Sequence, residues 1–71
     1  MTSPPKSEVT LGELSTLSAQ LEELMKRVTK VAESYLDTSD SRVAHDLFTA
    51  ERALHGARRA LHQATDLLKK S

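Results

Sequence analysis

The sequence contains no cysteine and no tryptophan, and its aromatic residues are one tyrosine and one phenylalanine. Without cysteine, the chain can form neither disulfides nor thiolate zinc sites. No run of about 18 apolar residues occurs, so no segment is expected to cross a membrane. Ten basic residues balance ten acidic ones. No net charge therefore attracts the chain to nucleic acid or to a membrane surface.

A chain of 71 residues is long enough for one small domain with a marginal core. Small domains gain further stability from disulfides, metals or association. Since disulfides are excluded, association is the expected source. Residues 1–6 lack the apolar segment of a secretory signal, so we expect a soluble, cytoplasmic protein.

The first eight residues differ in composition from those that follow. Residues 1–8 carry two prolines and no apolar periodicity, which predicts a flexible tail. Thr10 and Glu13 match the capping box S/T-x-x-E and predict a helix that starts near Leu11. Apolar residues then recur in steps of three and four: Leu14, Leu17, Leu21, Leu24, Val28, Val31 and Tyr35. The chain therefore divides into a tail, residues 1–8, and a helical unit, residues 9–71, whose first helix spans about residues 11–36.

A second apolar repeat follows a short polar segment. Residues 37–40 are Asp, Thr, Ser and Asp, which favour turns and helix caps. Beyond them the same steps recur: Val43, Leu47, Ala50, Leu54, Ala57, Leu61, Ala64 and Leu68. This pattern predicts a second helix over about residues 41–69, antiparallel to the first because the loop over residues 37–40 is short.

The two repeats match each other when the chain is folded about this loop. In heptad notation, Leu21 and Leu54 stand at a positions, and Leu24 and Ala57 at d positions. If facing residues have numbers that sum to 78, every a position of one helix meets a d position of the other. The predicted fold is therefore all-α, an antiparallel two-helix hairpin that resembles a coiled coil, with a seam of a and d residues.

Further apolar residues lie on one flank of this predicted seam, mostly near the loop. They are Leu11, Met25, Ala32, Leu36, Ala44 and Phe48. A hairpin alone would leave them in water, and contiguous exposed apolar patches are typical of interfaces. We therefore predict that the flank forms a homodimer interface that closes a four-helix bundle, or else binds another protein.

A basic group on the second helix suggests an alternative function. It consists of Arg52, His55, Arg58, Arg59 and His62. Such a face can contact phosphates, and weak RNA or DNA binding is the alternative hypothesis. The group lacks aromatic residues for base stacking, and Glu51 and Asp66 dilute its charge. A solvated charged face is the interpretation we favour.

No motif in the sequence predicts catalysis, a cofactor, a metal or a small-molecule substrate. Glycine-rich phosphate loops, metalloprotease pairs and nucleophile elbows are absent. The histidines do not have the i, i+4 spacing of a helical metal pair. The sequence thus predicts a non-enzymatic module for protein–protein interaction or scaffolding.

Overall fold

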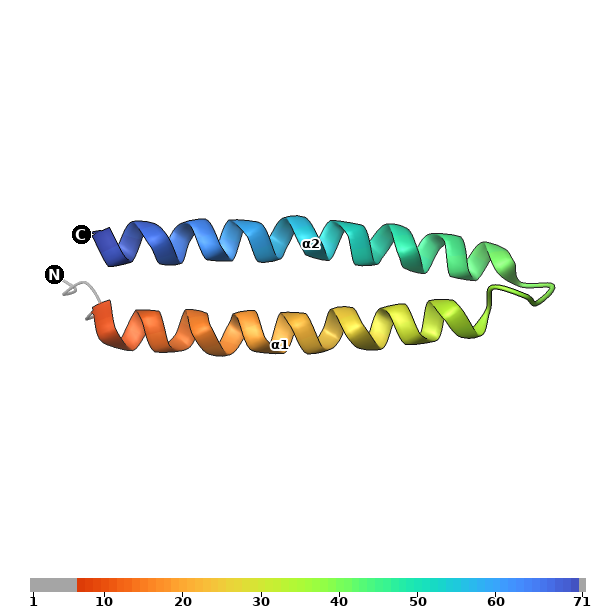
Figure 1. Ribbon diagram of the computed structural model, residues 1–71, viewed down its shortest axis with the longest axis horizontal. Coiled ribbons are helices and arrows are strands. Elements are labelled where there is room, and N and C mark those ends of the chain that lie inside the picture. The colour runs from red at the N-terminus through yellow and green to blue at the C-terminus, as the bar shows by residue number, and fades with distance from the viewer. Residues whose placement is uncertain (1–6, 71) are drawn as a thin grey trace, which may run out of the picture.

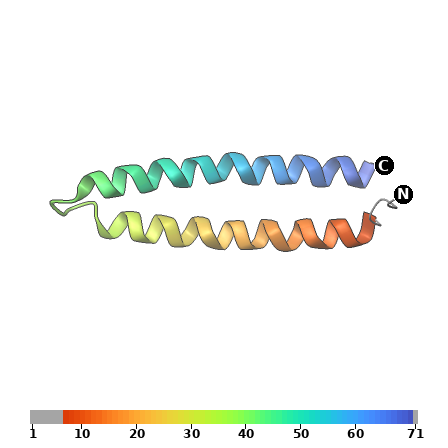
Figure 2. The same ribbon diagram turned by 180° about the vertical axis from the view of Figure 1, so that it is seen from behind.

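The computed structural model describes residues 7–70, which form two antiparallel α-helices lying side by side (Figures 1 and 2). Helix α1 spans Ser7–Ser34 and helix α2 spans Ser41–Lys70. The connection lies at one end of the hairpin, and both outer helix ends lie together at the other end (Figure 1). The principal dimensions are 56 × 22 × 15 Å. The predicted all-α antiparallel hairpin is confirmed.

Helix α1 begins and ends earlier than the sequence predicted. It starts at Ser7 instead of near Leu11 and stops at Ser34 instead of about residue 36. Thr10 therefore lies inside the helix and does not cap it. No proline or glycine separates Ser7 from Leu11, so nothing prevents an additional turn. Residues 1–6 of the predicted tail lie outside the described residues.

The connection between the helices is tightened by backbone and side-chain hydrogen bonds. After Ser34, the amides of Tyr35 and Leu36 donate to carbonyls three residues back, at 3.1 and 3.3 Å, as is common at helix ends. The Thr38 hydroxyl donates to the Tyr35 carbonyl at 2.8 Å and accepts from the Asp40 amide at 3.1 Å. Thr38 thus links the end of α1 to the residue that precedes α2.

The interior of the hairpin consists of a and e positions instead of the predicted a and d positions. Met25, Ala32 and Ala44 are buried, with 5%, 0% and 1% of their surfaces exposed, and all three stand at e. The a residues are half-buried along most of both helices: Leu14, Leu21, Val28, Leu47, Leu54, Leu61 and Leu68. Both helices are therefore rotated about their own axes, relative to the predicted seam, by about half of the 100° step per residue.

This rotation brings the smallest apolar residues together near the loop. Ala32 precedes the end of α1 by two residues, and Ala44 follows the start of α2 by three. The short connection holds the helices close here, and alanine allows their axes to approach. In the predicted seam the larger Val31 and Val43 would have occupied this region.

A buried charge should reveal which residues form the interior. Ala32→Asp places an uncompensated carboxylate between the helices and should lower the free energy of unfolding by about 2–3 kcal/mol. The matched control is Ala19→Asp, the same change at an exposed position of α1, which should cost less than about 1 kcal/mol. Urea unfolding followed by far-ultraviolet circular dichroism measures both. Equal losses would contradict the a/e interior.

Gly56 should be replaceable by alanine. A Cβ atom at Gly56 or at Gly12 would meet nothing within 4 Å. Gly56→Ala should therefore stabilise the protein by about 0.5–1 kcal/mol, because alanine favours the helix. Thermal unfolding of both variants provides the measurement. A destabilised Gly56→Ala beside a stabilised Gly12→Ala would show that another helix packs closely against α2 at this position.

Candidate functional site

Large apolar side chains remain exposed along one side of α1. Leu17, Leu24 and Val31 are 40%, 44% and 48% exposed. They are seven residues apart, at successive d positions, so they form a straight row along the helix. The prediction that these three residues fill the seam is wrong, because the rotation of α1 turns them outward.

A second row lies on α2 and continues this surface. Val43 is 41% exposed, and Ala50 and Ala57 are also exposed. The two helices are antiparallel and turn the same pair of positions inward, so their d positions lie on one side of the hairpin. We call the six residues of both rows the apolar face: Leu17, Leu24, Val31, Val43, Ala50 and Ala57.

The flank predicted to bind a partner takes a different place in the structure. Met25, Ala32 and Ala44 lie buried between the helices, while Leu11 and Phe48 are half-buried. Leu36, 51% exposed, is the exposed member of this set. Since the hairpin itself covers most of the flank, the apolar face replaces it as the candidate interaction surface.

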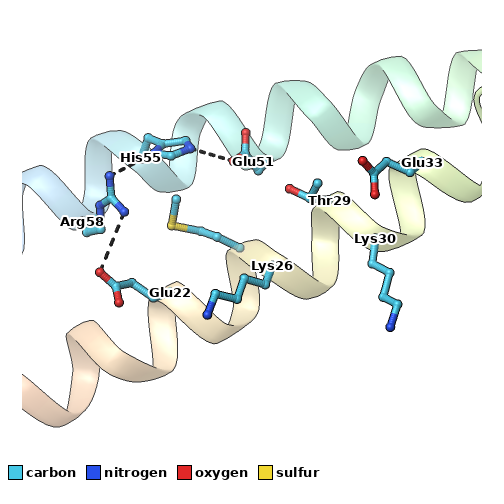
Figure 3. A pocket seen from close by; sticks show the side chains of 9 residues that line it. Glu22, Lys26, Thr29, Lys30, Glu33, Glu51, His55 and Arg58 are labelled. Atoms are coloured by element: carbon cyan, nitrogen blue, oxygen red, sulfur yellow. Dashed lines mark hydrogen bonds and ion pairs between the residues drawn. The ribbon is translucent and has the colours of Figure 1, made fainter.

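The opposite side of the hairpin carries a polar groove (Figure 3). Its volume is about 590 Å³. The lining residues come from both helices: Glu22, Met25, Lys26, Thr29, Lys30, Glu33, Glu51, His55 and Arg58. The groove contains three acidic and three lysine or arginine side chains, so its formal charge is balanced. A strongly charged ligand of either sign finds no net attraction here.

Within the groove, four side chains form a chain of polar contacts across the two helices (Figure 3). His55 Nε2 lies 2.6 Å from Glu51 Oε2, and Arg58 Nη2 lies 3.3 Å from His55 Nδ1. A guanidinium can only donate, so Nδ1 accepts and the Nε2–H donates to Glu51. Arg58 Nη1 also lies 3.8 Å from Glu22 Oε1 on α1. Arg58 thus connects the helices through a partly exposed ion pair.

The structure separates the predicted basic group into two sets. His55 and Arg58 are half-buried and are engaged with the glutamates of the groove. Arg52, Arg59 and His62 are exposed. Because two of the five residues have acidic neighbours within 4 Å, the group offers phosphates less positive charge than the sequence suggested. This arrangement weakens the nucleic-acid hypothesis.

Among residues 7–70, no group of three or more histidine, aspartate or glutamate side chains is placed to hold a metal ion. The same part of the chain contains no helix that is long and apolar enough to span a membrane. What the described residues offer is therefore two surfaces of different chemistry, one apolar and one with balanced charge.

Comparisons with protein-family models, curated proteins and solved structures found no match to this chain.

The Arg58–Glu22 ion pair should contribute weakly to stability. A double-mutant cycle with Glu22→Gln and Arg58→Gln should give a coupling energy of about 0.2–1 kcal/mol, since both groups are partly solvated. The coupling should shrink in high salt. A control cycle that pairs Glu22→Gln with Arg59→Gln should give none. Equal coupling in both cycles would show that Arg58 does not link the helices.

Proposed function

We propose that this chain is a non-enzymatic helical-hairpin module that acts through its apolar face, and that it associates with itself into a four-helix bundle. The observation that carries the proposal is the exposure of Leu17, Leu24 and Val31. The adjacent e positions, which include Ser18 and Ala32, face the second helix instead. The row of large apolar side chains at the d positions of α1 thus remains available to a partner.

The interior of the hairpin is too small to account for a stable monomer. In the described residues the buried apolar set consists of Met25, Ala32 and Ala44, and no large side chain is fully buried. A domain of about 60 residues already buries only about 60% of the surface of its unfolded chain. Association that covers the apolar face would supply the missing core.

The accessible surface supports the same conclusion. The chain exposes 5739 Å², whereas a compact monomer of 7.8 kDa would expose about 4,400 Å². The surplus of about 1,300 Å² exceeds the roughly 800 Å² that each partner contributes to a standard interface. The elongated chain can therefore lose the area of a standard dimer interface and still expose as much surface as a compact monomer of the same mass.

The width of the apolar stripe on α1 also favours a bundle. Positions d, a and e are represented by Leu24, Val28 and Met25, which together span about 100° of the helix circumference. A helix in a four-helix bundle contacts two neighbours and buries a stripe of this width. A single partner helix needs only the two positions that α2 covers here.

Self-association should depend on Leu24. In sedimentation equilibrium, the wild type should reach twice the 7.8 kDa chain mass as its concentration rises through the micromolar range. Leu24→Gln should weaken the dimer at least about tenfold, because both copies lose an apolar contact worth up to about 1.5–3 kcal/mol when fully buried.

The matched control for this measurement is Leu36→Gln, at an exposed leucine outside the apolar face. This variant should dimerise like the wild type. Circular dichroism of both variants checks that they remain helical. A wild type that stays monomeric and helical at the highest concentration would contradict the proposed self-association.

A further inference from the structure

The two rows of the apolar face differ in size, and this difference bears on how two copies fit together. Leu17, Leu24 and Val31 on α1 are large. On α2, Val43 near the loop is followed by the small Ala50 and Ala57. One side of the apolar face therefore protrudes beyond the other along most of its length.

From this asymmetry, and resting on the proposed self-association, we infer that two hairpins pack with their loops at the same end, so that α1 of each copy lies over α2 of the other. The two-fold axis then runs parallel to the helices. In this arrangement the leucine row of each copy fills the depression over the alanine row of the other copy, and both contacts are identical.

The heights of the residues along the hairpin fit this arrangement. The ion pair between Glu22 and Arg58 places these two residues within about one helical turn of each other along the hairpin. A two-fold axis parallel to the helices leaves the level of each residue unchanged. Leu24 of one copy therefore lies within about one helical turn of the level of Ala57 of the second copy, and Val31 within about one turn of the level of Ala50.

The other face-to-face arrangement brings unequal surfaces together. A two-fold axis perpendicular to the helices places the loops at opposite ends, with α1 over α1 and α2 over α2. Leucine then meets leucine or valine on one side, while alanine meets mainly alanine on the other. The two helix pairs would require different axial separations, because the distance between packed helices depends on the side chains at the contact. Tilting the hairpins to satisfy both would open a void or strain the leucine contacts.

A distance between the two loops tests the inference. Because the chain has no cysteine, Ser39→Cys provides one thiol per copy, at an exposed position of the loop. With a nitroxide label on this thiol, dipolar electron paramagnetic resonance should give a short distance, of the order of the 15 Å thickness of one hairpin, because the copies stack face to face. Loops at opposite ends would give a distance near the 56 Å length of the hairpin.

A mixed sample provides the matched control. Ser39→Cys copies and Lys69→Cys copies, carrying spectrally distinct labels, should show a long distance between the unlike labels. A long distance between two Ser39→Cys labels, together with a short distance between the Ser39→Cys and Lys69→Cys labels of the mixed sample, would overturn the inferred orientation. The proposed dimer itself would stand. A labelled chain that is helical, monomeric in sedimentation and without dipolar coupling would overturn the self-association itself, and the orientation with it.

Discussion

A single neighbouring helix cannot cover both the d and the e positions of an α-helix whose a positions it contacts. The d and e positions lie on either side of a and are about 100° apart. In this hairpin each helix covers the e side of the other, so the d side of both remains in water. The buried alanines, the exposed leucine row and the polar groove all follow from this packing of the e sides against each other.

The residues near the loop provide a physical reason why the helices pack through their e sides and not through their d sides. Ala32 and Ala44 are the most deeply buried residues described, and they lie beside the short connection. Further along, the flexible Met25 fills the interior, as methionine does in irregular spaces. The Glu22–Arg58 pair then bridges the helices on the e side. Because both side chains are partly exposed, this pair contributes little to stability.

Much of the fold could be predicted from the sequence. The two repeats and the polar segment of residues 37–40 gave the number, direction and approximate ends of the helices, because steps of three and four leave few alternatives. The rotation of the two helices about their own axes, which places e and not d positions in the interior, could not be predicted in the same way. The e positions of α2 include Glu51 and Arg58, which look unsuited to an interior. The structure places them at the edge of the groove, half-buried, where their charged groups reach polar partners.

Because the rotation of the helices was not predicted, the candidate interaction surface was predicted on the e side of the hairpin, whereas the structure exposes apolar residues on the d side. The sequence correctly indicated more apolar surface than one seam can hold, but it assigned Met25 and Leu24 to each other's places. Apolar residues at d, a and e define the width of the apolar stripe on a helix. They do not show whether the d side or the e side of this stripe packs against the other helix of the hairpin. The small size of Ala32 and Ala44 was the available signal, since close packing beside a short loop favours alanine.

The two sides of the hairpin have different roles in the proposed dimer. The rows of the apolar face contain no charged residue, so burial supplies attraction without fixing an orientation. Orientation then depends on shape, which here means the contrast between Leu24 and Ala57. The polar groove lies on the outer side of such a dimer and stays in contact with water. Its ion pair would therefore remain sensitive to salt in the proposed dimer, whereas the six residues of the apolar face are all uncharged.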